Sequence, residues 1–130
     1  DYPLSTQKAR DVLPDMIPRQ DAVFNVGRVA MLVDALHTGN LEQLALAMED
    51  KIHQPYRMSL ITGMEEIIPM ARELGAWGVI ISGAGPTLLI VSDKGRDFTP
   101  LVRFLKTKGV NARLKTVRPV DDGAEIIEQW

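Results

Sequence analysis

Residues 77–91 constrain the fold of this 130-residue chain more than any other stretch. They contain two short apolar runs, WGVIIS and TLLIV, both rich in β-branched side chains, and between them lie Gly83, Ala84, Gly85 and Pro86. Short runs of this kind beside glycine predict two buried strands, and the four residues between them fit the loop of a hairpin. The rest of the chain is therefore expected to pack around an antiparallel hairpin.

Helical periodicity dominates the residues before this hairpin. Four helices are predicted there, over about residues 7–13, 21–39, 41–54 and 63–75. Residues that favour the N-cap precede three of them, namely Thr6, Asp21 and Asn40. The apolar residues of the second helix form a wide stripe, which predicts that this helix is the central buried one. Pro69 lies within the fourth helix, so we expect a kink or a later start there.

Three further elements are predicted after the hairpin: a helix over residues 97–109, a half-buried strand over 110–119 and a short last strand over 124–130. Helices followed by strands with one helix between them indicate the α+β class, with an antiparallel sheet covered by helices. The sequence contains no internal repeat, low-complexity tract or linker, so we expect a single domain over residues 1–130.

The composition excludes several classes of function. A formal net charge of −2, with Lys and Arg spread along the chain, argues against nucleic acid as a partner. The absence of cysteine excludes disulfides, thiolate metal sites and a cysteine nucleophile, and it favours a cytoplasmic location. No apolar run approaches the roughly 20 residues that cross a bilayer, so no membrane contact is expected. The chain opens on Asp1 in place of Met, which fits a piece of a longer protein.

Two polar stretches have both a structural and a functional interpretation. SGAGPT, residues 82–87, fits a plain turn, or a turn whose N–H groups face an anionic ligand, and its spacing matches no nucleotide-binding glycine fingerprint. KIHQPYR, residues 51–57, fits a solvated helix end or a cluster of binding groups. With only two histidines in the chain and no combination of acid, base and nucleophile, we predict no metal-binding or catalytic residue here.

A third polar stretch is STQKAR, residues 5–10. If its helix begins at Gln7, Thr6 and Arg10 lie four residues apart on one face of the first turn. A hydroxyl beside a guanidinium suits a carboxylate or phosphate, which arginine binds with two parallel hydrogen bonds. The same pair also fits a helix cap and a surface charge.

Taken in order, TQKARDVLP, QDAVFNVGRVAMLVDAL, HQPYR and GVIISGAGPTLLIV resemble the C-terminal half of the homoserine kinases, a family of the GHMP small-molecule kinase superfamily. SGAGPT resembles the third motif of the whole superfamily, whereas DAVFN and HQPYR point to the homoserine kinases. The resemblance covers almost the whole chain. It implies an α+β domain with a ferredoxin-like antiparallel sheet and helices packed on it, while the N-terminal ATP-binding domain of the family is absent from these residues.

The resemblance implies transfer of the γ-phosphoryl group of ATP, with Mg²⁺, to the side-chain hydroxyl of L-homoserine, a step of threonine biosynthesis. Arg10 and Arg57 match the family arginines that hold the substrate carboxylate, and Thr6 lies alongside. Two fixed cations around the carboxylate would orient the amino acid and leave its hydroxyl end free to meet the phosphate.

The same resemblance implies that the turn formed by Gly83, Ala84 and Gly85 lines the site near the phosphates, where a bulky side chain would intrude. Phosphoryl transfer depends chiefly on positioning and charge stabilisation, so such a wall can matter without acid–base chemistry. His53 and Asn25 are secondary candidates for the same site.

The family's phosphate-binding loop, Mg²⁺ carboxylate and adenine pocket belong to the N-terminal domain, and their motifs do not occur in this sequence. The resemblance therefore implies that ATP and Mg²⁺ bind mainly to that domain and that this chain alone is inactive. The sequence does not determine the oligomeric state, and the resemblance leaves a homodimer open, because family members often dimerise. Two alternatives stay open: a stand-alone amino-acid-binding or regulatory module, and a GHMP kinase with another acceptor, such as a mevalonate-type or sugar kinase.

Overall fold

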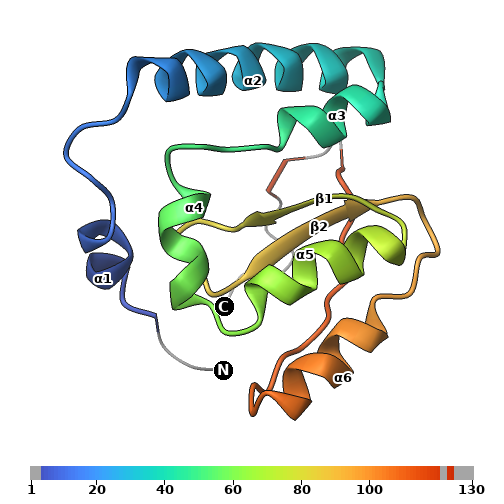
Figure 1. The fold of residues 1–130 in the computed structure, drawn as a ribbon. Helices are drawn as coiled ribbons and strands as arrows, with labels where there is room; N and C mark the ends of the chain where they lie inside the picture. The colour runs from blue at the N-terminus through green and yellow to red at the C-terminus, as the bar shows by residue number, and fades with distance from the viewer. Residues whose placement is uncertain (1–3, 121–122, 125–130) are drawn as a thin grey trace, which may run out of the picture.

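The computed structural model describes residues 4–120 and 123–124, and these form three layers (Figure 1). The middle layer is a hairpin of β1 (Ala76–Ile81) and β2 (Leu88–Ser92). On one side of it lie α2 (Arg19–Thr38) and α3 (Leu41–Ala47), and on the other lie α5 (Met64–Glu73) and α6 (Thr99–Thr107). Near the loop of the hairpin lie α1 (Thr6–Asp11), α4 (Gln54–Arg57) and the 3₁₀ helix η1 (Met58–Leu60). The predicted α+β class, with helices packed on an antiparallel sheet, is confirmed.

The hairpin forms as the sequence predicts. Strands β1 and β2 pair antiparallel along their length. Beyond them, the Ser82 N–H donates to the Thr87 carbonyl oxygen (2.8 Å) and the Gly85 N–H donates to the Ser82 oxygen (3.1 Å), which closes a β-turn. The loop is therefore the four residues 83–86. Side chains alternate between the two faces of the hairpin, so each face packs against a different pair of helices.

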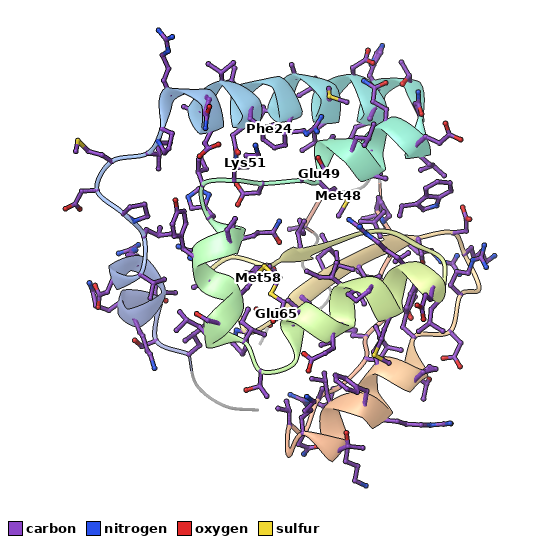
Figure 2. The ribbon with its side chains drawn as sticks, in the orientation of Figure 1. Phe24, Met48, Glu49, Lys51, Met58 and Glu65 are labelled. Carbon is purple, nitrogen blue, oxygen red and sulfur yellow. The ribbon has the colours of Figure 1, made fainter. Side chains whose placement is uncertain are left out.

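Helix α2 is held to α3 and to the segment after α3 by polar and aromatic contacts. The amide of Gln43 donates to Asp34 Oδ2 (2.8 Å), which joins α3 to α2. Phe24 of α2 lies against Lys51, whose Nζ is 4.5 Å from the centre of the ring (Figure 2). These contacts tie α2 to α3 and to the segment that follows α3.

The prediction that α2 is the central buried helix is wrong for the part of the chain that the structure describes. Ala35 is its buried residue. Five apolar side chains of the predicted stripe are between 60% and 71% exposed: Val23, Val26, Val29, Val33 and Leu36. An apolar stripe shows which face of a helix can be buried, but burial needs a partner. Within residues 4–120 and 123–124 no element packs closely enough to bury these five side chains.

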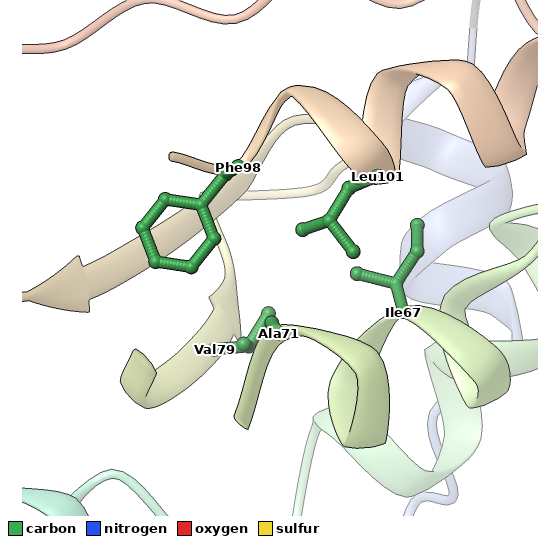
Figure 3. Packing of buried hydrophobic residues seen from close by; sticks show 5 residues of the cluster. All are labelled: Ile67, Ala71, Val79, Phe98 and Leu101. Atoms are coloured by element: carbon green, nitrogen blue, oxygen red, sulfur yellow. The ribbon is translucent and has the colours of Figure 1, made fainter. Parts of the chain in front are cut away.

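The hydrophobic core lies on the opposite face of the hairpin. Ile67 and Ala71 of α5 pack with Val79 of β1 and with Phe98 and Leu101 at the start of α6 (Figure 3). Helix α6 presents these residues because its proline falls in the first turn, where a missing N–H costs nothing. The core therefore fixes β1, and with it the hairpin loop, against α5 and α6.

Several predicted boundaries are corrected by the structure. Helix α1 is capped by Ser5, whose Oγ accepts from the Lys8 N–H (3.0 Å), so Thr6 is the first helical residue and not the cap. Helix α2 begins before Asp21, directly after Pro18. The Asn40 cap is confirmed, but α3 ends well before residue 54. Helix α5 contains Pro69 without a delayed start.

The predicted strand over residues 110–119 is absent from the sheet, which has two strands within the described residues. Alternating side chains indicate which residues share a face, but a strand also needs a partner edge for its backbone hydrogen bonds. The predicted last strand, 124–130, lies outside the described residues except for Ala124. No helix in the described ranges is both long and apolar enough to span a membrane.

Candidate functional site

A cleft of about 710 Å³ lies between the α2–α3 pair and the hairpin, on the face opposite the core. Its apolar wall includes Val29, Leu32, Leu36, Ile80 and Leu89. Its polar end is formed by Asn25, Asp50, His53, Gln54, Arg57 and Gly83. Four of the residues predicted from the sequence thus line one cleft, although they come from α2, the segment before α4, α4 itself and the hairpin loop.

The carboxylate of Asp50 is the main acceptor at this polar end, and its side chain is only 15% exposed. It accepts hydrogen bonds from Asn25 Nδ2 (2.5 Å) and from the N–H groups of Ile52 (3.3 Å), His53 (2.7 Å) and Gln54 (2.5 Å). Burial alone would raise the pKa of Asp50, but these hydrogen bonds outweigh it and hold the pKa below its ordinary value. Asp50 is therefore ionised at neutral pH.

Asn25 connects α2 to the turn that precedes α4. Its amide nitrogen donates to Asp50, and its Oδ1 accepts from the Lys51 N–H (2.9 Å). Both ends of the amide are thus engaged by the turn. Asn25, the secondary site candidate from the DAVFN stretch, therefore fixes the segment before HQPYR against α2.

The guanidinium of Arg57 joins two segments that are far apart in the sequence. Nε donates to the carbonyl oxygen of Ala9 in α1 (2.8 Å), and Nη1 donates to that of Gly83 in the hairpin loop (3.2 Å). Both acceptors are neutral, and no ion pair with Arg57 occurs among the residues that the structure describes. Arginine has five N–H groups, and within the described part of the chain two of them are bonded, which leaves three that can bind a ligand.

Thr6 and Arg10 lie four residues apart in α1, as the sequence predicts, and both are exposed. Neither lines the cleft. Ala9, directly before Arg10, is nevertheless the residue whose carbonyl oxygen anchors Arg57. The structure thus brings the backbone of α1 to Arg57 and leaves the side chains of Thr6 and Arg10 at the surface.

The three small residues of the hairpin loop differ in their surroundings. Gly83 is exposed, and a Cβ added there would meet no atom within 4 Å. At Gly85 an added Cβ would lie 2.9 Å from Ile61 Cδ1, so this glycine faces the interior. Both have positive φ, +62° and +82°, which favours glycine. Ala84 between them is half-buried. The open side of the turn is therefore at Gly83, beside Arg57.

His53 lines the cleft with a side chain that is 55% exposed, and its Nδ1 lies 3.9 Å from Asp50 Oδ1. Within the described residues, no three His, Cys, Asp or Glu side chains gather to hold a metal ion.

Sequence reasoning missed Asp50 and the role of Gln54. The side chain of Gln54 accepts a hydrogen bond from the Ile81 N–H (3.0 Å), which ties α4 to the end of β1. The signal for Asp50 was present, because aspartate a few residues before a short helix is a frequent acceptor for the first helical N–H groups. Gln54 gives no comparable signal, since its partner is 27 residues away.

Comparison with known proteins identifies the class. Residues 32–111 match the family model described as GHMP kinases C terminal. Because this match covers more than half of the chain, the chain belongs to the GHMP kinase C-terminal family. The resemblance drawn from the sequence motifs is confirmed.

Individual relatives are more specific. The chain is 41% identical over 132 residues to a homoserine kinase of Synechococcus and 42% identical over 129 residues to that of Moorella thermoacetica. These alignments cover 99% and 97% of this chain but only 43% of each relative, so the chain spans less than half of their length. The crystal structure of homoserine kinase from Cytophaga hutchinsonii superposes on 68% of this chain and 28% of its own, with 34% identity and a TM-score of 0.66.

Proposed function

We propose that this chain is the C-terminal part of a homoserine kinase and supplies the groups that hold the carboxylate of L-homoserine. The observation that carries the proposal is Arg57, a cation fixed by two neutral carbonyl oxygens at the polar end of the cleft. The relatives named above, all homoserine kinases, support the choice of substrate.

Fixing Arg57 to backbone oxygens has a chemical consequence. A guanidinium paired with aspartate or glutamate would already be neutralised, whereas one held by carbonyl dipoles keeps its full charge for an incoming anion. Its remaining N–H groups form a planar fork that suits a carboxylate. Because two anchors already fix the guanidinium, little conformational entropy is lost when the ligand binds.

The proposal also gives Thr6 and Arg10 a part in binding the carboxylate, and it makes Gly83, Ala84 and Gly85 a wall near the phosphates. The exposure of Arg10 and the open space at Gly83 support these assignments, because both groups are accessible to a ligand. His53 and Asn25 remain secondary candidates. In the reaction, the homoserine hydroxyl oxygen bonds to the γ-phosphorus of ATP, ADP leaves, and the hydroxyl proton is released.

ATP and Mg²⁺ are assigned mainly to an N-terminal domain that the proposed enzyme joins to this chain. The absence of a phosphate-binding glycine loop from the sequence supports that division. The exposed Val23, Val26 and Val33 of α2, which do not line the cleft, also support a partner domain, because apolar surfaces of this kind commonly mark contact sites. The proposal further includes a place in threonine biosynthesis, a cytoplasmic location and a homodimer. Light scattering of the full-length protein would test the dimer.

The function is tested by assaying the full-length protein, which contains the N-terminal domain, against a panel of acceptors. ATP consumption should depend on L-homoserine and yield O-phospho-L-homoserine, and mevalonate and sugars should give little turnover. The 130-residue chain alone should be inactive. Indifference to homoserine would refute the proposal. Tight binding of homoserine or threonine by the chain alone, seen by calorimetry without ATP, would instead favour a stand-alone amino-acid-binding module.

A further inference from the structure

Asp50 holds the start of α4 from outside the helix. Its two carboxylate oxygens accept from Asn25 of α2 and from three successive N–H groups, those of Ile52, His53 and Gln54. The first N–H groups of any helix lack partners within the helix. Here one carboxylate, itself largely buried, binds the N–H of Gln54, the first residue of α4, and those of His53 and Ile52 directly before it, and it ties them to α2 at the same time.

Helix α4 depends on such contacts because it is only one turn long, Gln54–Arg57. A single turn is not stable by itself, since nucleating a helix fixes several residues for one hydrogen bond. Two backbone bonds define this turn: the Arg57 N–H donates to the His53 oxygen at a long 3.3 Å, and the Met58 N–H donates to the Gln54 oxygen. The conformation of α4 is therefore set mainly by the groups that hold its first residues.

The other end of α4 is Arg57. The side chain of Gln54 binds the Ile81 N–H at one end of the turn, while the guanidinium of Arg57 reaches α1 and the hairpin loop from the other. Because one turn separates them, a rotation or unwinding of α4 at Gln54 moves the backbone that carries Arg57. The direction of the free N–H groups of Arg57 thus depends on how firmly the start of the turn is held.

We propose that Asp50 is a positioning residue for the acceptor site, which fixes α4 and thereby aims Arg57 without contacting the substrate. This inference rests on the proposed function, since Arg57 is the group that it serves. Asn25 contributes to the same positioning, because it orients the carboxylate of Asp50 and also binds the Lys51 N–H. The ionised state of Asp50 suits this role, because a charged acceptor binds N–H groups more strongly than a neutral one.

The test compares Asp50→Ala and Asp50→Asn with a matched control, Asp34→Asn, in the full-length enzyme. Asp34 also accepts a side-chain hydrogen bond that joins α2 to the next helix, but its partner Gln43 lies in α3, away from Arg57. Losing a capping carboxylate should raise KM for homoserine by roughly 2- to 30-fold in Asp50→Ala. Asp50→Asn should show a smaller rise, KM for ATP should stay unchanged in both, and Asp34→Asn should match the wild type.

A second measurement separates positioning from general loss of structure. In an Arg57→Ala background, Asp50→Ala should add little further increase in KM for homoserine, because the group that it aims is gone. Additive effects, or equal increases in KM for ATP and for homoserine, would overturn the inference. If Asp50→Ala fails to fold, the same comparison is made with Asp50→Asn. A wild-type enzyme that does not use homoserine refutes the proposed function, whereas a homoserine kinase indifferent to Asp50 refutes only this inference.

Discussion

Replacing Arg57 by alanine should weaken the use of homoserine without weakening the binding of ATP. The change removes a guanidinium that lies 2.8 Å from the Ala9 oxygen and 3.2 Å from the Gly83 oxygen, together with the N–H groups that remain for a ligand. A hydrogen bond to a charged group contributes about 1.5–3 kcal/mol. At about 1.4 kcal/mol per factor of ten, kcat/KM for homoserine should fall by roughly 10- to 150-fold.

A substrate that lacks the carboxylate tests whether the fall in kcat/KM in Arg57→Ala comes from the contact between Arg57 and the carboxylate. 3-Aminopropan-1-ol is homoserine without its carboxylate, so the wild-type enzyme should lose at least as much with this substrate as Arg57→Ala loses with homoserine, since Arg10 and Thr6 are also assigned to the carboxylate. If Arg57 acts through the carboxylate, Arg57→Ala should hardly change the already low kcat/KM for 3-aminopropan-1-ol. The measurement is the four kcat/KM values, obtained by coupled detection of ADP, and the coupling energy between them.

Arg103→Ala is the matched control, because it removes an exposed arginine from α6, on the far side of the hairpin from the cleft. It should have the wild-type kcat/KM with both substrates. Arg57→Lys keeps the charge but loses the planar fork, so it should recover only part of the activity. Equal losses with both substrates in Arg57→Ala would show that Arg57 does not bind the carboxylate and would refute the reasoning.

Three further predictions concern the hairpin loop and Asp50 in the same full-length enzyme. Gly85→Ala should lower the melting temperature more than Gly83→Ala, since both strain a positive φ but only the former crowds Ile61; equal shifts would contradict the packing argument. Ala84→Leu should leave the fold largely intact and reduce kcat, and a normal kcat would leave the loop as a plain hairpin connection. The pKa of Asp50 is lowered in the folded state, so its contribution to stability is present above about pH 4 and is lost as the pH falls through the lower folded pKa. The difference in urea unfolding free energy between wild type and Asp50→Asn should therefore shrink from about pH 6 to about pH 3, and a constant difference would count against this assignment.

The hairpin and the helices next to it could be predicted because their signals are local. Glycine beside β-branched runs encodes β1 and β2, and the Asn40 cap encodes the start of α3. The burial of α2 could not be predicted in this way, because an apolar stripe does not say which element will cover it. The strand predicted over residues 110–119 was wrong for a related reason, since alternating side chains do not specify which strand edge would pair with them.

The candidate site shows the same division. Arg57, His53, Asn25 and Gly83 could be chosen from their stretches, and the structure places all four on one cleft. The hydrogen bonds that anchor Arg57 could not be predicted, because they go to backbone carbonyl oxygens, and every residue has such an oxygen. Sequence patterns show side-chain chemistry, whereas these anchors depend on the path of the main chain.

That dependence has an evolutionary consequence. A point mutation at Ala9 or Gly83 changes a side chain, but it cannot delete the carbonyl oxygen that Arg57 uses. Drift at these two positions is limited by the burial of Ala9 and the positive φ of Gly83, and not by the hydrogen bonds to Arg57. A lineage whose enzyme came to prefer another substrate than homoserine would have to alter Arg57 itself, or acquire an insertion or deletion that changes the backbone path of α1 or the hairpin loop.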